Sequence, residues 1–564
     1  MISDLMDALV ILLPAVPMAS ALAIAALSAR PRRQLARLSV FLSGATFALA
    51  AILLIAYLGT SSPTWLTTGL GWGSLYLDPL SIIMSLLVAG ISLVVHVYSV
   101  RYMAEEPGYA RFFALLDLMT AAILLMVAAG DFITLLVAWH LIGVLLYFLL
   151  AHNTQRPAAH RYAFWTFFTY RLGDLPLVLA AVLLYQTYDT IALPELFERI
   201  AAMPNVQGIL GFSLLEVVAF LIALAAFARS AQFPFHTWLP YTMEGPTPVS
   251  ALMHAGIVNA GGFLLNRFAP VFVEAGSVLH LVFAVGLITA VLGSVLMLTQ
   301  NDIKKSLGYS TMGQMGFMFV ECGVGAFSLA IYHLIAHGLF KGTMFLGAGG
   351  VIGDARKHDG VPHEDVYTLV VERKPAAARL PWMLAAAITV VVPFLLLGLS
   401  HWLVEGDFVG QQGAIVLLFF GWVTGAQLLF ATHRLRVESP SRLMVMIILS
   451  LAIVVVGYTL IEHNFGLFMY PDRELSERLY EAASIPLATF GGLITLVTIA
   501  IVVGWIAAYY TMANRDPLEG RIGNPRMALY SLFSREFYVA DVYSRVSESV
   551  IALSKRFNIW SRWV

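Results

Sequence analysis

Long apolar stretches recur along the whole chain, and they constrain its fold more than any other feature. A helix needs about twenty mainly apolar residues to cross a bilayer, and this length predicts about fifteen spans. The predicted spans are residues 5–29, 38–58, 79–101, 111–129, 131–151, 161–186, 212–235, 239–266, 277–299, 303–322, 325–350, 380–402, 412–432, 442–462 and 486–511. With 59% hydrophobic and 12% charged residues, the chain is expected to be an all-α polytopic membrane protein.

Basic residues gather in alternate loops between the predicted spans. Arginines stand at positions 30, 32, 33 and 37, again at 101 and 111, and later in the loop from Arg356 to Arg379. Because basic loops stay in the cytoplasm, we expect the N-terminus outside and the C-terminus inside. The net charge of -1 argues against a nucleic-acid partner. The single cysteine, Cys322, excludes an intrachain disulfide and a cysteine-based metal site.

Two segments outside the spans carry their own patterns. The outer connection 59–77 is rich in glycine, serine, threonine and aromatic residues, which favours a small hairpin. Residues 512–564 contain apolar positions at near-helical spacing from Phe537 to Val550 among charged residues. We interpret this tail as an amphipathic helix that lies on the cytoplasmic membrane surface or on a partner subunit.

Two prolines break predicted spans at related positions. Pro234 interrupts the seventh span and Pro393 the twelfth, five spans later. Transporters built from inverted repeats place discontinuous helices at matching positions beside an ion site. The alternative is that proline is simply common in transmembrane helices. The repeat interpretation divides the chain into N-terminal helices (1–110), a first repeat (111–266), a second repeat (277–432), C-terminal helices (433–511) and the tail.

The stretch 228–262 concentrates polar residues at membrane depth. It contains Arg229, Pro234, Glu244, His254 and Asn259. Polar side chains and helix breakers inside a membrane usually mark the pathway of an ion or substrate. Arginine does not lose its proton, so Arg229 can set the local potential, whereas His254 can carry a proton.

Two further polar features precede this stretch. His140 lies within the fifth span, and it is either a hydrogen-bonded core residue or a proton relay. Arg171 and Asp174 stand three residues apart on one face of the sixth span. They form either a local ion pair that makes insertion tolerable or a carboxylate gate whose partner can change.

His333, His337 and Lys341 follow one another at intervals of four in the eleventh span. Four residues advance a helix by about 400°, so the three side chains share one face. Such alignment favours a proton wire over two structural histidines and a lysine. Two histidines at this spacing could hold zinc, but a third ligand with motif spacing is not evident, and no nucleotide-binding motif is present.

Residues 229–240, 245–254, 302–317 and 332–341 resemble the antiporter-like subunits of respiratory complex I (NuoL type) and of Mrp cation/proton antiporters. The resemblance covers roughly residues 60–400. It implies a proton-conducting fold of two inverted five-helix repeats with broken seventh and twelfth helices. The implied proton path comprises His140, Asp174, Arg229, His254, His333, His337 and Lys341. The implied gating or supporting residues are Arg171, Pro234, Glu244, Asn259, Lys304, Lys305 and Pro393.

The sequence departs from the family pattern at several of these positions. His140 stands where the family has a glutamate, and Arg229 stands where it has a lysine. The family's twelfth-helix lysine has no counterpart, because residues 381–400 carry no charge. The long lateral helix of the complex I subunit is also missing, which puts the complex I pumping scheme in doubt.

Residues 254–270 are most similar to the membrane subunits of the DAB inorganic-carbon accumulation complexes of bacteria. This resemblance implies a bacterial inner-membrane location and a soluble DabA-like partner that resembles β-carbonic anhydrase and carries zinc. The chain itself would then hold no cofactor and no catalytic residue. The proton motive force would drive hydration of CO2 to bicarbonate on the partner. Alternatives are a complex I or Mrp-type antiporter subunit, or a passive membrane anchor for a soluble enzyme.

Overall fold

The computed structural model describes residues 2–60, 63–67, 72–208, 211–300, 302–348, 464–486, 488–493, 495–499, 502–503 and 531–560, with residues 391, 395 and 399. Pro393 and the predicted spans 412–432 and 442–462 lie outside these residues, as does nearly all of 380–402. In the described part, nine helices are long and apolar enough to cross a membrane. The prediction of a helical, polytopic membrane protein is therefore confirmed.

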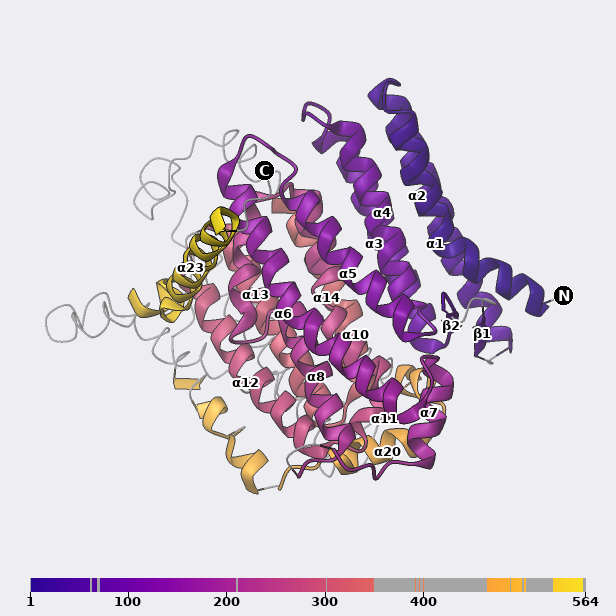
Figure 1. Cartoon of the computed structure of the whole chain (residues 1–564), viewed down its shortest axis with the longest axis vertical. Helices are drawn as coiled ribbons and strands as arrows, with labels where there is room; N and C mark the ends of the chain where they lie inside the picture. The colour runs from indigo at the N-terminus through magenta and orange to yellow at the C-terminus, as the bar shows by residue number, and fades with distance from the viewer. Residues whose placement is uncertain are drawn as a thin grey trace, which may run out of the picture.

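The long helices of the described part overlap the predicted spans. The first six are α1 (Ile2–Ala26), α2 (Arg32–Thr60), α3 (Pro79–Tyr102), α4 (Tyr109–Val127), α5 (Phe132–Leu150) and α6 (Pro157–Tyr188). The later ones are α8 (Leu214–Arg229), α9 (Thr247–Leu252), α10 (Ala260–Arg267), α12 (Gly276–Leu298), α13 (Ile303–Gly323) and α14 (Phe327–Ala348). In Figure 1, α1 and α2 stand at one edge of the bundle beside α3 and α4.

Several short elements lie at the end of the bundle where α3 begins. The predicted hairpin is present, because β1 (Thr64–Leu66) pairs with β2 (Leu75–Leu77) in antiparallel register. The short helices α7 (Leu193–Ala202), α11 (Ala269–Phe272) and α20 (Arg473–Ala482) are not among the predicted spans. They contain only four to ten residues, too few for the twenty-residue criterion to detect.

Aspartates fix the starts of two central helices. Asp131 caps α5 by accepting a 2.8 Å hydrogen bond from the Thr134 amide, and its other oxygen accepts from Ser74 beside the hairpin. Asp78 caps α3 in the same way through the Ser81 amide. Arg267, at the end of α10, lies 2.7 Å from the Asp78 carboxylate and ties the two helix ends together.

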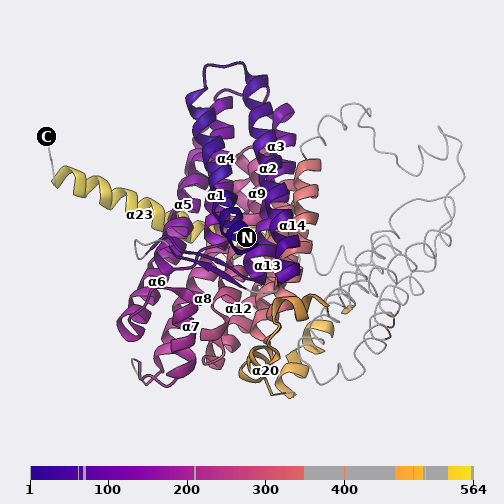
Figure 2. The same ribbon diagram turned by 90° about the vertical axis from the view of Figure 1, so that its right-hand side faces the viewer.

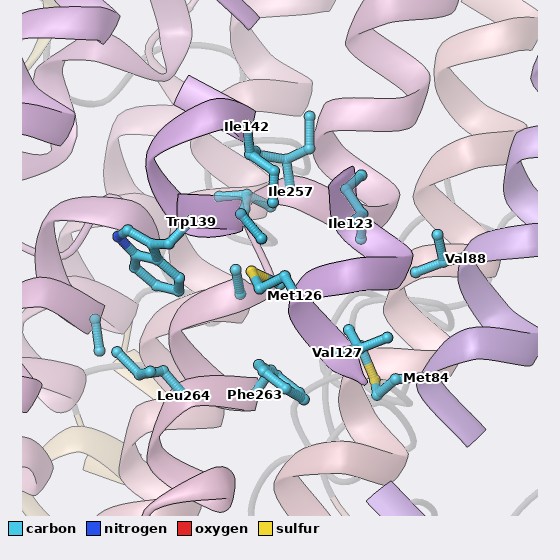
Figure 3. Close-up of a cluster of buried hydrophobic side chains, with 14 of the residues drawn as sticks. Met84, Val88, Ile123, Met126, Val127, Trp139, Ile142, Ile257, Phe263 and Leu264 are labelled. Carbon is cyan, nitrogen blue, oxygen red and sulfur yellow. The ribbon is translucent and has the colours of Figure 1, made fainter. Parts of the chain in front are cut away.

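The hydrophobic core lies where α3, α4, α5 and α10 meet. Figure 3 shows side chains from these helices directed toward one another. Met84, Val127, Trp139 and Phe263 are each at most 3% exposed. This packing fixes Trp139 of α5, whose ring and carbonyl contact Arg229.

The predicted break at Pro234 is present. Helix α8 ends at Arg229, and the chain continues through the 3₁₀ turns η1 (Phe235–Trp238) and η2 (Pro240–Glu244). Between α9 and α10 it forms a π-helix, η3 (Met253–Ile257). Single π turns inside α-helices are frequent at functional sites, because they release backbone carbonyls from their usual partners.

The predicted amphipathic tail forms η5 (Glu536–Tyr538) and α23 (Val539–Trp560), and it packs against this break. Tyr241 donates a 3.0 Å hydrogen bond to Glu536, and Tyr543 donates one of the same length to the Pro234 carbonyl. Arg161 of α6 donates to Ser544. Figure 2 shows that α23 then projects away from the bundle.

Helices α12 and α13 approach each other through glycines. A Cβ atom on Gly286 would lie 2.8 Å from the carbonyl oxygen of Gly316 and equally close to the amide nitrogen of Val320. Small residues at matching positions let two membrane helices come into backbone contact, which gains van der Waals energy. An added methyl group would have to separate the helices.

We therefore predict that Gly286→Ala destabilises the protein by about 1–3 kcal/mol, the typical cost of overpacking. The matched control is Gly347→Ala in α14, where an added Cβ meets no atom within 4 Å. The free energy of unfolding in detergent measures both. Equal effects of the two substitutions would contradict close packing of α12 on α13.

The contact of the tail with the break should depend on pH. Burial raises the pKa of the Glu536 carboxyl above its usual value. Between its usual and its raised pKa the docked tail therefore binds a proton that the free tail does not, so docking should strengthen as pH falls and weaken as pH rises. Glu536→Gln should abolish this dependence.

Spin labels on Ala158→Cys and Ser549→Cys measure this docking as a distance, because both positions are exposed and Cys322 is buried. Wild type should show more of the short distance at acidic than at neutral pH. If the distance distribution of Glu536→Gln depends on pH as much as that of the wild type, another group causes the pH dependence.

Candidate functional site

Helices α5, α6 and α8 bring three cationic or titratable groups around one buried carboxylate. Asp174 of α6 is 8% exposed. Its Oδ2 atom lies 2.9 Å from Nη2 of Arg171 and 3.2 Å from Nδ1 of His140. Its Oδ1 atom lies 3.8 Å from Nη2 of Arg229. The predicted pairing of Arg171 with Asp174 is therefore present, and two further groups join it.

Arg229 is held in place by aromatic rings as well as by charge. It is 2% exposed and donates a 2.6 Å hydrogen bond to the Trp139 carbonyl. Its guanidinium carbon lies 4.2 Å from the Trp139 ring and 4.1 Å from the Tyr170 ring. Arginine keeps its charge and stacks on aromatic faces, so this side chain is a fixed positive charge at the end of α8.

His140 lies at the margin of this cluster. Its side chain is 54% exposed, whereas Asp174 behind it is buried. Nη1 of Arg171 lies 2.7 Å from Nε2 of His140. A guanidinium can only donate, so the imidazole is the acceptor in this contact.

A second cluster lies between α13 and α14. His333, His337 and Lys341 occupy one buried face of α14, as their spacing predicts, and are 7%, 5% and 2% exposed. Nδ1 of His333 lies 3.0 Å from the Glu321 carboxylate, and its Nε2 atom lies 2.9 Å from Oε1 of Gln314. Lys341 donates a 2.8 Å hydrogen bond to Ser310.

The three partners on α13 were missed by the sequence analysis. Ser310, Gln314 and Glu321 are separated by four and seven residues, a spacing that places them on one helix face. Their polarity within the predicted span 303–322 was the available signal. Polar residues in a span become candidate partners only once it is known which face of α13 meets α14, and the sequence does not show this.

Two histidines of this region have no polar partner among the described residues. Both ring nitrogens of His254 and of His337 are buried without a hydrogen bond there. The His254 ring stacks on Phe345 of α14, with centroids 4.1 Å apart. The structure therefore places His254 of the predicted proton path against α14.

The backbone next to Arg229 is tied to the segment that follows the π-helix. Ser230 donates a 2.6 Å hydrogen bond to the Val258 carbonyl and accepts a 3.0 Å bond from the Gly261 amide. Its partners lie just after the π-helix that carries His254. A movement of α8 at Arg229 would therefore be transmitted to the backbone at His254.

The remaining candidates lie around the break. Asn259 is fully buried and donates to the Ala255 carbonyl. Nζ of Lys305 lies 4.6 Å from the centre of the Tyr241 ring, and Lys304 is half-buried. Pro234 and Glu244 are exposed. In the described ranges no three histidine, cysteine, aspartate or glutamate side chains are grouped as a metal site would require.

Two family descriptions match the chain. The description "NADH:quinone oxidoreductase/Mrp antiporter, TM" matches residues 129–428. The description "NADH-Ubiquinone oxidoreductase (complex I), chain 5 N-terminus" matches residues 65–113. The first match covers more than half of the chain and includes every group of both clusters.

Among curated proteins, the "probable inorganic carbon transporter subunit DabB1" of Halothiobacillus neapolitanus is 63% identical over 553 residues, which cover 98% of this chain and 99% of that protein. The NAD(P)H-quinone oxidoreductase chain 5 of Synechocystis sp. is 36% identical over 64% of this chain. The match covers only 53% of that relative's length.

Two solved structures share the fold. A chain of the Mrp complex from Dietzia sp. has a TM-score of 0.56 at 25% identity, and the match covers 93% of this chain and 62% of that one. A chain of the archaeal membrane-bound sulfane sulfur reductase has a TM-score of 0.57 at 19% identity, over 85% of this chain and 98% of that one. Because its sequence identity is only 19%, the second match shows similarity of the fold alone.

The geometry around Arg229 predicts that lysine cannot replace it without loss. Arg229→Lys would remove the hydrogen bond to Trp139 and the planar contact with two rings, and should destabilise the protein by about 1.5–3 kcal/mol. The matched control is Arg199→Lys, whose half-exposed ion pair with Glu195 should matter by less than about 1 kcal/mol. Denaturant unfolding in detergent compares them, and equal losses would contradict the role of the rings.

Proposed function

Because the chain belongs to the NADH:quinone oxidoreductase/Mrp antiporter family of membrane proteins, we propose that it is the proton-conducting, energy-coupling membrane subunit of an inorganic-carbon uptake complex. The similarity to DabB1 supports inorganic carbon as the substrate of the complex, because the similarity extends over nearly the full length of both chains. The substrate class therefore rests on a whole relative rather than on an isolated motif.

The observation that carries the proton-conducting role is the buried row of titratable side chains on α14. His337 has no hydrogen-bond partner among the described residues, and it lies between His333 and Lys341 on the same helix face. An imidazole with free ring nitrogens can accept a proton and pass it on. Like charges at this depth repel strongly, so a proton on one group lowers the affinity of its neighbour and favours transfer.

The Asp174 cluster supplies the proposed entry. His140 is exposed on one side and lies against Asp174 on the other. When Arg171 swings away from the imidazole, His140 can take up a proton and deliver it toward the carboxylate. Arg229 stays charged throughout, and its contact with Asp174 makes its potential act on that carboxylate. The Ser230 contact then couples this event to the helix that carries His254.

The complex needs a chain that performs the hydration chemistry. We propose a soluble zinc-bearing partner that resembles β-carbonic anhydrase and forms bicarbonate from CO2 on the cytoplasmic side. This chain then conducts protons and is not itself the enzyme. Proton flow down the gradient would make hydration one-way. The proposed location is a bacterial inner membrane, with the N-terminus outside and the arginine-rich loops and tail in the cytoplasm.

A second candidate function follows from the Mrp likeness. The fold similarity to a chain of an Mrp complex would also suit a subunit of a cation/proton antiporter. Copurification separates the two functions, because a large zinc-bearing soluble partner accompanies only a carbon-uptake complex. Copurified membrane antiporter or quinone-oxidoreductase subunits would support the alternative.

We predict that Lys341→Ala or His337→Ala lowers bicarbonate accumulation in whole cells on the order of a hundredfold, the typical contribution of a proton-transfer group. The matched control is Lys555→Ala, on the exposed end of α23, which should retain accumulation. Normal uptake in both α14 variants would mean that the row is structural.

Dissipation of the proton gradient tests the energy coupling separately. A protonophore should abolish accumulation by the wild-type complex, because one-way hydration draws on proton flow. Accumulation that persists after the gradient has collapsed would instead identify the chain as a passive anchor for its partner.

A further inference from the structure

Glu321 is a buried carboxylate beside the row of titratable side chains on α14. It belongs to α13, is 1% exposed, and faces His333 of α14. Both of its oxygens are in hydrogen-bond contact with Nδ1 of His333, Oε1 at 3.0 Å and Oε2 at 3.1 Å. The other ring nitrogen of His333 lies 2.9 Å from Oε1 of Gln314. The imidazole is therefore held between two side chains of α13, with the carboxylate at one of its nitrogens.

The counter-charge of Glu321 distinguishes it from the carboxylate of the first cluster. Asp174 lies beside Arg171 and Arg229, and an arginine keeps its charge at every accessible pH. In the described part of the chain, the ion-pair partner of Glu321 is His333 alone. A histidine gains and loses its charge near neutral pH. The electrostatic environment of Glu321 therefore changes whenever a proton enters or leaves His333.

This dependence links the protonation of the two groups. A buried charge is costly unless it is paired. When His333 passes a proton to the row, an ionised Glu321 loses its counter-charge, and this cost favours uptake of a new proton by the carboxylate. Glu321 can then give that proton to the ring nitrogen that it contacts. The two side chains therefore bind and release protons as one unit.

Glu321 stands at the outer end of the row. Lys304 and Lys305 lie in the first turn of α13, and the positive-inside rule places this end of the helix in the cytoplasm. Glu321 is two residues before the other end. Lys341 follows His333 by eight residues, which is about 12 Å further toward the cytoplasm. The carboxylate thus lies where a proton from outside would reach the row first.

The outer end of α13 is covered by protein that carries polar groups. Tyr470 donates a 3.0 Å hydrogen bond to Asn266, whose amide nitrogen lies 4.0 Å from the sulfur of Cys322. Cys322 is the residue after Glu321. A Cβ atom on Gly325, in the loop after α13, would lie 2.8 Å from a backbone carbonyl oxygen of α20. α20 and the segment before it therefore lie over this end and bring a tyrosine hydroxyl to it.

We propose that Glu321 is the proton-loading residue of the α14 row, which takes up protons from the outer side and delivers them to His333. This role rests on the proposed function, because it requires that the row conducts protons. In each cycle one proton enters at the carboxylate, and one leaves the imidazole toward His337. The ring centres of His333 and His337 lie 6.4 Å apart. The pair carries the same charge before and after the cycle.

Other charged or titratable groups lie on the elements that pack against α13. They are Lys304, Lys305, Tyr309 and Cys322 of α13 itself, His280 of α12, His337 and Lys341 of α14, Tyr241 and Glu244 of η2, Arg267 of α10 and Tyr480 of α20. Arg267 is engaged by Asp78, and Nε2 of His280 lies 3.1 Å from the Ser484 carbonyl oxygen. A test must therefore change the carboxyl group of Glu321 alone.

Bicarbonate accumulation in whole cells with the full complex tests the role in two matched pairs. Glu321→Gln keeps the size of the wild-type side chain but cannot ionise. Glu321→Asp and Glu321→Asn are equally short, and only the first can bind and release a proton. We expect Glu321→Gln to lower accumulation on the order of a hundredfold, and Glu321→Asn to accumulate less than Glu321→Asp. The second pair decides if Glu321→Gln does not assemble. Equal accumulation within both pairs would overturn the proposal.

The external pH separates proton loading from a structural role. Without the carboxyl group, His333 must take its proton directly from water, so loading slows as the external proton concentration falls. The accumulation of Glu321→Gln, divided by that of the wild type at the same pH, should therefore decrease as the external pH rises. A variant that only assembles poorly would lower this ratio equally at every pH. A ratio that does not change with pH would assign Glu321 a structural role and overturn the proposal.

Two further variants complete the experiment. Cys322→Ala changes the neighbouring buried side chain and should retain accumulation. A loss in Cys322→Ala equal to that in Glu321→Gln would assign the effect to packing and overturn the loading role. Lys341→Ala separates this role from the proposed function. Lost uptake in Lys341→Ala with normal uptake in Glu321→Gln would overturn only the loading role, whereas normal uptake in both would overturn the proposed function and the loading role with it.

Discussion

The pairing of buried charge is the constraint on which the polar centre of this protein depends. In a membrane interior, an ionised side chain is stable only if opposite charges, hydrogen bonds or aromatic faces surround it. Asp174 meets this requirement through Arg171 and Arg229, and Arg229 meets it through Trp139 and Tyr170. The hydrophobic cluster shown in Figure 3 thus also serves the polar site, because it packs around Trp139, on whose ring the Arg229 guanidinium rests.

Irregular backbone connects the charges to one another. Helix α8 ends at Arg229, and the next residue, Ser230, bonds to a carbonyl that follows the π-helix of His254. The tail contacts the same break, where Tyr543 donates to the Pro234 carbonyl. The tail is therefore one hydrogen bond away from the interrupted helix.

Much of the fold could be predicted from sequence because hydropathy and helical spacing are local properties. The hairpin, the amphipathic tail, the break before Pro234 and the shared face of His333, His337 and Lys341 all follow from neighbouring residues. The short helix α7 was not predicted, because its ten residues are fewer than a membrane span requires. The contact of His254 with Phe345 was also not predicted, because a residue's neighbours in sequence do not fix which helix its ring will meet.

The sequence by itself determined where the membrane helices run, which of their faces are polar and where the chain breaks. The tertiary structure alone decided which polar faces meet. Glu321 became the partner of His333, and Asp78 the partner of Arg267, only when separate helices packed together. The physical reason is that such a pair depends on the relative rotation and height of two helices. Both are set by the packing of many side chains along the whole contact, as the glycine contact of α12 with α13 illustrates.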